Sequence, residues 1–222
     1  VSNLDRDVPP PLTGRKIHKL LVDMTGDLDP YREIKANHTA MALKMLPKLL
    51  ENMEASPWPF RTAIQYAIAG NSIDLAVGSG IAPDIDEAFR FATTKPVNPG
   101  KVRNLESKVN DAASVLFLAD NAGELVFDTP LLSLIGKDKV IVAVRGGPIM
   151  NDATLAEAEQ SGLCKEFEVI DNGSDAPGTW LDECSPEFGH MFHDCDVVIS
   201  KGQGNYETLD ESSRKIQFVF LV

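Results

Sequence analysis

Two oxygen-bearing side chains, Asp120 and Asn121, follow directly after a short apolar run from Val115 to Leu118. A run of this length, bounded by turn residues, is typical of a buried strand because it is too short for a helix. In open α/β sheets, ligands bind outside the carboxyl ends of the strands. The position of Asp120 and Asn121 therefore predicts a binding site at the end of this strand.

A third oxygen donor, Asp152, follows Pro148 at a predicted strand-to-helix junction. Carboxylate and amide oxygens suit divalent cations such as Mg²⁺ or Mn²⁺, which commonly bind one or two carboxylates together with substrate phosphate. Such a cation can polarise a phosphoryl oxygen or lower the pKa of a bound water. The same residues could instead cap helices, with Asn121 and Glu124 as a capping box and Asp152 at an N-cap. Spacing alone leaves metal binding and capping open.

A second candidate site is the stretch Ser200-Lys-Gly-Gln-Gly-Asn205, which follows another apolar run. Gly202 and Gly204 allow backbone N–H groups to form an anion-binding nest, and Lys201 adds a positive charge. Together they suit a phosphate group. The stretch also begins like a dinucleotide-binding fingerprint, but Glu207 stands where the third glycine is needed. A tight turn with a solvated lysine is the other interpretation.

A zinc site is not expected at His190 and His193, although Cys184 and Cys195 lie nearby in the sequence. The chain has no Cys-x-x-Cys pair, and the histidines are not in a known ligand spacing. They fit better near the C-terminal end of a helix, where positive charge is favourable. The chain also has no Gly-x-Ser-x-Gly elbow and no Walker-type loop, which argues against a serine hydrolase or a P-loop protein.

The predicted secondary structure that must position these residues changes near Ser114, from mainly helical to alternating strands and helices. The first part of the chain reads as mainly helical, and the strongest pattern of apolar residues runs from Tyr31 to Met53. We therefore expect a helical N-terminal domain over residues 1–113, after an irregular lead-in up to about residue 14. The other helices predicted there are Arg15–Leu21, Phe60–Ala69, Asp84–Thr93 and Lys101–Ala113.

Residues 114–222 alternate strand-like runs with helix-compatible segments, which predicts βαβ units and a parallel sheet with all strand ends on one edge. The predicted strands are Val115–Leu118, Val140–Val144, Phe167–Ile170, Val197–Ile199 and Phe218–Val222. The predicted helices between them are Glu124–Leu134, Asp152–Ser161, Ser185–Phe192 and Glu207–Ile216. Four strand runs end in polar turns with glycine, which are Asp120-Asn-Ala-Gly123, Arg145-Gly-Gly-Pro148, Asp171-Asn-Gly173 and Ser200-Lys-Gly-Gln-Gly204. The convergence of these turns on one edge would make a site.

The composition narrows the classes of function. The 222 residues, 43% hydrophobic and 24% charged, are typical of a globular protein with a sizeable core. The net charge of −12 argues against binding to nucleic acid or to an anionic membrane surface. No apolar run is long enough to span a membrane, and no signal-peptide pattern begins the chain. With three cysteines and no disulfide framework, we expect a cytoplasmic location.

Four phrases make the chain resemble the damage-control phosphatase family, long known as domain of unknown function 89, and especially its compact archaeal and bacterial members. In the family's order, they are Ala69-Gly-Asn-Ser-Ile-Asp74, Ala119-Asp-Asn-Ala-Gly-Glu124, Gly147-Pro-Ile-Met-Asn-Asp-Ala-Thr154 and Ser200-Lys-Gly-Gln-Gly-Asn-Tyr-Glu-Thr-Leu209. Weaker similarity lies around Asp29-Pro-Tyr31 and Lys35. The resemblance implies that residues 114–222 form a Rossmann-like, three-layer α/β domain with a mainly parallel sheet, behind the helical part.

The resemblance also implies metal-dependent hydrolysis of phosphate monoesters, such as sugar phosphates or damaged phosphometabolites. It implies that Asp120, Asn121 and Asp152 bind a divalent ion, which could be Mg²⁺, Mn²⁺, Co²⁺ or Ni²⁺. Asp120 and Lys201 would be catalytic. The expected phosphate- and substrate-binding residues are Lys201, Gly202, Gly204, Asn205, Asn71, Asp74 and Glu124. The expected partner is a small phosphorylated metabolite, without nucleic acid or membrane, and a homo-oligomer is left open.

Two features depart from the family pattern. Compact relatives begin with a segment that carries a Cys-x-x-Cys pair, which this chain lacks, and they continue past the last strand, whereas this chain stops at Val222. We therefore expect that this chain is a shortened form of the protein, truncated at its C-terminus. The main alternative function is a Rossmann-type module that binds a nucleotide or S-adenosylmethionine, such as a methyltransferase. It would use the loop of Gly202 and Gly204 and need no metal.

Overall fold

The computed structural model describes residues 10–77 and 93–220, without the side chains of residues 72–77. Five strands form one all-parallel sheet in the order β3-β2-β1-β4-β5. Their bounds are Val115–Leu118 for β1, Val140–Val144 for β2, Glu168–Asp171 for β3, Val197–Lys201 for β4 and Ile216–Val219 for β5. This is the strand order of a doubly wound sheet, so the predicted α/β class with a parallel sheet is confirmed.

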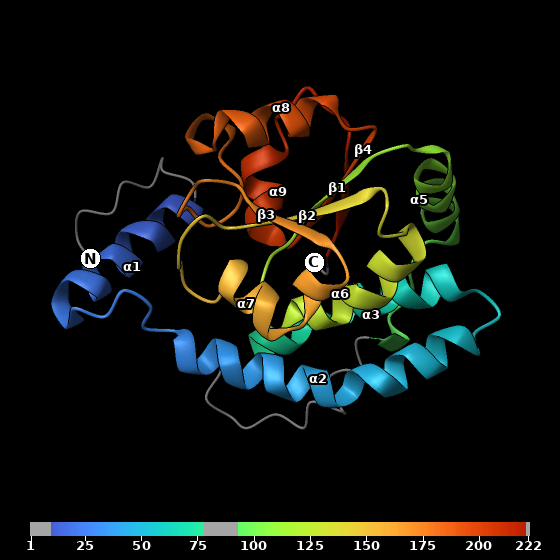
Figure 1. The fold of residues 1–222 in the computed structure, drawn as a ribbon, viewed down its shortest axis with the longest axis horizontal. Coiled ribbons are helices and arrows are strands. Elements are labelled where there is room, and N and C mark those ends of the chain that lie inside the picture. The colour runs from blue at the N-terminus through green and yellow to red at the C-terminus, as the bar shows by residue number, and fades with distance from the viewer. Residues whose placement is uncertain (1–9, 78–92, 221–222) are drawn as a thin grey trace.

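Helices cover both faces of the sheet, which gives three layers (Figure 1). One face packs against α2, α3, α5, α6 and α7, and the other against α8 and α9. The helix bounds are Pro10–Thr25 for α1, Arg32–Glu54 for α2, Pro59–Val77 for α3, Pro99–Asp111 for α5, Glu124–Ile135 for α6, Leu155–Gln160 for α7, Pro186–Asp194 for α8 and Gln203–Leu209 for α9. Short 3₁₀ turns occupy Leu163–Lys165 and Leu181–Glu183.

The central strand β1 shows why the sheet must be covered on both sides. Val115 and Phe117 belong to the hydrophobic cluster with α2, α3, α5 and α6, whereas Leu116 and Leu118 belong to the cluster with α8 and α9. All four side chains are at most 1% exposed. Alternate side chains of a strand point to opposite faces, so an uninterrupted apolar run indicates a strand that is buried on both.

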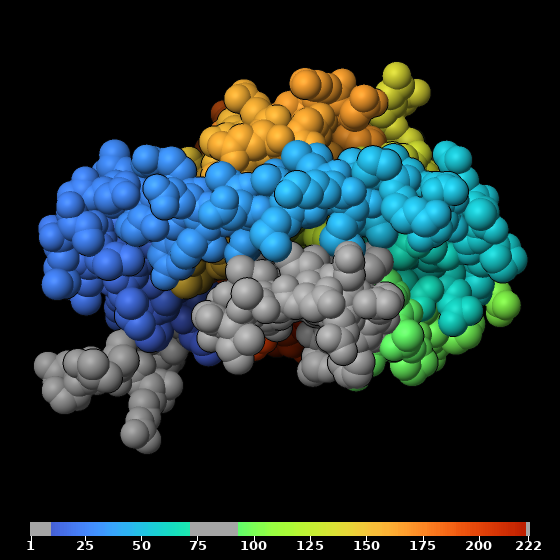
Figure 2. All heavy atoms as spheres, turned by 90° about the horizontal axis from the view of Figure 1, so that it is seen from below, coloured from blue at the N-terminus to red at the C-terminus, as the bar shows by residue number. Residues whose placement is uncertain are grey.

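Three of the helices that precede the sheet, α2, α3 and α5, pack on one of its faces. In Figure 2, α1 and α2 form a band from one end of the molecule toward the other. Residues of α2 and α3 share one hydrophobic cluster with β1 and α6. The division of the chain at residues 113 and 114 therefore stays a prediction, because this cluster spans both sides of it. Over the two described ranges, every helix falls short of the length or the apolarity that a membrane span requires.

Several predicted helix boundaries in the first half are wrong. Helix α1 begins at Pro10, well before Arg15, because proline fits the first turn of a helix, where its missing N–H is not needed. Helix α3 continues through Gly70 to Val77. A Cβ at Gly70 would lie 2.8 Å from Cβ of Phe127, so this glycine allows α3 to approach α6 instead of ending the helix. The predicted helix Asp84–Thr93 lies almost wholly outside the described residues.

In the second half, the predicted bounds of α9, β5 and α7 differ most from the observed ones. Helix α9 spans Gln203–Leu209 instead of Glu207–Ile216, because it starts directly after the glycine turn that ends β4. The next residues then turn and enter β5, which spans Ile216–Val219 instead of Phe218–Val222. Helix α7 begins at Leu155, so Asp152 lies in the preceding turn and not in the helix. His190 and His193 both lie in α8, which ends two residues after the predicted end at Phe192.

Candidate metal and phosphate site

The candidate site lies where β1 and β4 end side by side at the centre of the sheet. The chain leaves β1 into α6 on one face and leaves β4 into α9 on the other. Open α/β sheets bind ligands in the crevice at such a switch point. Leu118 pairs with Ser200, so Asp120 after β1 and Lys201 at the end of β4 reach the same edge.

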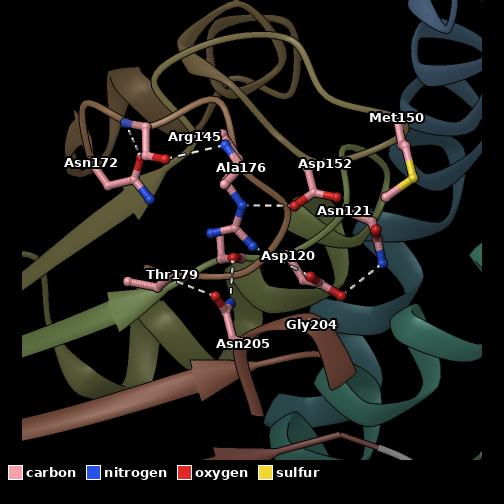
Figure 3. Close-up of polar contacts among 12 residues, drawn as sticks. Asp120, Asn121, Arg145, Met150, Asp152, Asn172, Ala176, Thr179, Gly204 and Asn205 are labelled. Carbon is pink, nitrogen blue, oxygen red and sulfur yellow. Dashed lines mark hydrogen bonds and ion pairs between the residues drawn. The ribbon is translucent and has the colours of Figure 1, made fainter. Parts of the chain in front are cut away.

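The three predicted metal ligands come together at this edge (Figure 3). Asn121 and Asp152 form an antiparallel bridge, and the N–H of Ala153 donates to the carbonyl of Asp120 at 2.8 Å. The amide nitrogen of Asn121 donates to Oδ2 of Asp120 at 3.0 Å. Asp120, Asn121 and Asp152 are each at most 9% exposed. Two carboxylates and one amide are therefore neighbours, although Asp152 lies 32 positions after Asp120.

The capping interpretation of these residues is wrong. Helix α6 begins after Gly123 without a side-chain cap, and Asn121 instead donates to Oε2 of Glu124 at 3.1 Å. The N-cap of α7 is Thr154, which forms a capping box with Glu157. Helix α6 thus starts without a side-chain cap and α7 is capped by Thr154, so neither Asn121 nor Asp152 caps a helix.

Four buried carboxylates surround this point, and two cations face them. We call the set the strand-end cluster, and its members are Asp120, Glu124, Asp128, Asp152, Arg145 and Lys201. With every group ionised, the cluster holds two more negative than positive charges. A buried charge is costly unless it is paired, so this excess calls for additional positive charge.

The pKa of Asp120 indicates the same shortage of positive charge. Burial raises the pKa of Asp120 well above its usual value, the charges of Glu124 and Asp152 raise it further, and Arg145 and Lys201 only partly oppose them. Burial likewise raises the pKa of Asp128 to about 7, against the opposing charge of Lys201. The protein's own cations therefore do not compensate these carboxylates, as is expected of a cation site.

The donor set fits a hard divalent cation. It offers oxygen atoms of Asp120, Asn121 and Asp152, the ligand type that Mg²⁺ and Mn²⁺ prefer. Over residues 10–77 and 93–220, no three side chains of His, Cys, Asp or Glu are grouped to hold a metal ion. The candidate set is of another kind, because an amide supplies its third oxygen.

Lys201 lies in a different environment from the one predicted. It is the last residue of β4 and fully buried, so the interpretation as a solvated turn lysine is wrong. Its Nζ donates to the carbonyl of Ala67 at 2.8 Å, to Asp128 at 2.7 Å and to Glu124. The three ammonium protons are thus used within the protein. The side chain lies between α3, which contains Ala67, and α6, which contains Glu124 and Asp128. Phosphate binding by Lys201 stays a prediction.

The glycine loop after β4 shapes the site through its backbone. Gly202 has φ +77°, and a Cβ there would lie 1.8 Å from Oδ2 of Asp120. Only glycine therefore allows the Asp120 carboxylate to lie against this loop. Gly204 lies close to the loop that follows β3, since a Cβ at Gly178 would lie 2.4 Å from the carbonyl oxygen of Gly204.

Asn205 and Asn71 connect the site to its surroundings. The amide nitrogen of Asn205 donates to the carbonyls of Ala119 at 3.1 Å and Lys201 at 2.8 Å, and its oxygen accepts from Thr179 at 2.7 Å (Figure 3). Asn205 therefore ties the ends of β1 and β4 together. The amide nitrogen of Asn71 lies 3.2 Å from both Asp120 and Glu124, so Asn71 borders the cluster. The side chain of Asp74 is outside the described part.

One residue of the site was missed from the sequence. Arg145 follows β2, and its guanidinium stands between Asp152 and Asp120 (Figure 3). Its Nε donates to Oδ2 of Asp152 at 2.7 Å, and Nη2 lies 3.6 Å from Oδ1 of Asp120. The available signal was the turn Arg145-Gly-Gly-Pro148 at the same sheet edge, but nothing in its spacing distinguished this arginine from a surface one.

Comparison with known proteins finds similar proteins both in sequence and in structure. The model of the damage-control phosphatase ARMT1-like domain matches residues 1–222. A damage-control phosphatase of Archaeoglobus fulgidus is 35% identical over 205 residues, which are 90% of this chain and 70% of that protein. A damage-control phosphatase of Pyrococcus horikoshii is 34% identical over 91% of this chain and 70% of its own length. The crystal structure of a DUF89 family protein from Pyrococcus horikoshii superimposes with a TM-score of 0.81 at 32% identity, and the match covers 99% of this chain and 76% of that one.

Proposed function

The chain belongs to the family of damage-control phosphatases with an ARMT1-like domain, and from this premise we propose that it is a divalent-metal-dependent phosphatase of small phosphorylated metabolites. The observation that carries the proposal is the meeting of Asp120, Asn121 and Asp152 in a buried cluster with excess negative charge. Phosphate esters are themselves anions, so a site of this charge needs a cation to bind them. Sugar phosphates or damaged phosphometabolites are the proposed substrate class.

In the proposed mechanism, Asp120, Asn121 and Asp152 hold the ion through their side-chain oxygens. A divalent cation supplies charge that polarises the phosphoryl group. The two nitrogen donors on Asp120, from Asn71 and Asn121, orient its carboxylate. Asn71 and Asn121 also contact Oε2 of Glu124, which Lys201 fixes from the other side. Lys201 thus acts as a positioning residue beneath the ligands, and the chemistry depends on positioning and electrostatics.

The alternative of a nucleotide or S-adenosylmethionine module is not favoured. The loop of Gly202 and Gly204 packs its backbone against Asp120 and Gly178, which a cofactor phosphate would have to displace. The third glycine of the fingerprint is also absent, with Glu207 in its place. Family membership and the carboxylate cluster both favour the phosphatase.

The proposal is tested by a phosphatase assay over a panel of sugar phosphates with Mg²⁺, Mn²⁺, Co²⁺ or Ni²⁺. We expect hydrolysis by the wild type that chelation abolishes, and a loss in kcat/KM of at least ~10²-fold in Asp120→Ala. The control is Glu51→Ala, an exposed carboxylate on α2 that pairs only with Lys48 among the described contacts. Equal activity in Asp120→Ala and the wild type would refute the proposed site.

A further inference from the structure

Arg145 is the one cation of the strand-end cluster with an unused donor. Its side chain is 2% exposed, and Nη2 is a buried nitrogen without a hydrogen-bond partner in the described structure. Lys201 differs, because it donates all three of its protons to protein oxygens. A buried donor without a hydrogen bond is costly, so native proteins seldom retain one without a reason.

The backbone under Arg145 holds the guanidinium in a fixed place. The N–H of Arg145 donates to the carbonyl of Ala153 at 2.8 Å, and Arg145 bridges to Thr154 in parallel. The next residue, Gly146, donates to the carbonyl of Ser174 at 2.8 Å, and a Cβ at Gly146 would lie 2.7 Å from the backbone of Gly173. The guanidinium is therefore anchored at its base by the loops that follow β2 and β3.

The anchoring leaves the outer end of the guanidinium directed at the site. Nε is held by Asp152, and Nη2 reaches toward Asp120 without forming a hydrogen bond (Figure 3). Arginine presents several N–H donors in a planar fork that matches the oxygens of a phosphate. A phosphate that bound to a cation held by Asp120 and Asp152 would therefore meet the unused Nη2 donor.

From this geometry we propose that Arg145 binds the phosphate of the substrate through its Nη nitrogens, a role that rests on the proposed phosphatase function. The competing explanation is that Arg145 only neutralises Asp120 and Asp152. The two explanations differ in what removal of the guanidinium does. Under both explanations Arg145 competes with the metal for the carboxylates, so its removal leaves Mn²⁺ binding intact or tighter. Only if Arg145 contacts the phosphate does its removal also weaken phosphate binding.

The experiment compares the wild type with Arg145→Met and Arg145→Lys, after circular dichroism has shown that each is folded. Calorimetric titrations measure binding of Mn²⁺ alone and of inorganic phosphate in the presence of Mn²⁺, and assays give kcat and KM. For Arg145→Met we expect unchanged or tighter Mn²⁺ binding and phosphate binding at least ~10-fold weaker, which corresponds to about 1.4 kcal/mol. Arg145→Lys restores part of the affinity, because it keeps the charge but not the fork.

The matched control is Arg103→Met, an arginine of α5 that lies over the ring of Trp58, away from the site. Phosphate affinity within twofold of the wild type in Arg145→Met overturns the inference, as does a loss of Mn²⁺ binding in the folded variant. If Arg145→Met does not fold, the same criteria apply to Arg145→Lys. A wild type that binds Mn²⁺ and phosphate but hydrolyses no ester would refute the proposed function. The binding data would then still decide whether Arg145 binds phosphate.

Discussion

Two groups of buried charges in this molecule contain the same kinds of side chains, but they differ in how well the protein stabilises their carboxylates. The first, which we call the Lys35 cluster, consists of Lys35, Asp29 and Glu157, with Nζ of Lys35 at 3.0 Å from Asp29 and 2.9 Å from Glu157. The second is the strand-end cluster. Both bury charged side chains, and both contain more carboxylates than cations.

The difference lies in how well each carboxylate is stabilised. Burial acts to raise the pKa of Glu157, but hydrogen bonds and charge from Thr154 and Lys35 outweigh it, so the pKa is lowered. The N–H and hydroxyl of Thr154 both donate to Oε2 of Glu157, at 2.9 and 2.6 Å. At Asp120 the balance has the opposite sign. A buried charge alone therefore does not indicate a site, whereas carboxylates that the protein leaves uncompensated do.

The largest effect that would sharpen this comparison is expected for Lys35→Met. The substitution leaves Asp29 and Glu157 buried without their cation, which typically costs about 3–5 kcal/mol of unfolding free energy. Urea unfolding measures the loss. The control is Lys48→Met on the same helix, whose pair with Glu51 is exposed and worth roughly 0.5 kcal/mol or less. Equal losses in the two variants would show that the Lys35 cluster contributes no more than a surface ion pair.

A smaller effect, opposite in sign between the clusters, is expected when one carboxylate is made neutral. In metal-free protein, Asp120→Asn should raise the unfolding free energy by roughly 0.5–2 kcal/mol, because it removes a charge that its neighbours repel. Glu157→Gln should lower it by about 1–3 kcal/mol, because Lys35 and Thr154 lose a charged acceptor. Thermal unfolding in the presence of a chelator measures both. A loss of stability in both variants would contradict the difference drawn between the clusters.

Much of the fold followed from the sequence for a simple reason. The runs from Val115 and Val140 are buried on both faces, so they are continuously apolar and their bounds were predicted correctly. Segment ends depended on tertiary contacts instead. Gly70 reads as a helix end in the sequence, yet it lies inside α3, where the glycine makes room for Phe127.

The site was predictable only in part. The sequence predicted that Asp120, Asn121 and Asp152 meet, because all of them follow strands of one parallel sheet, and the structure brings them together. The burial of Lys201 was not predicted, because β4 extends two residues further than expected and the side chain lies against α6. Arg145 was missed because an unused donor depends on packing, which the spacing of residues in the sequence does not indicate.

The most direct test of the central claim is a calorimetric titration of metal-free protein with Mn²⁺. We compare the wild type with Asp152→Asn from the strand-end cluster and Glu157→Gln from the Lys35 cluster, five positions apart in the same segment. The account predicts one Mn²⁺ site per chain in the wild type, a site of similar affinity in Glu157→Gln, and binding at least ~10-fold weaker in Asp152→Asn. Equal Mn²⁺ affinity in Asp152→Asn and the wild type, or no Mn²⁺ binding by the wild type, would contradict it.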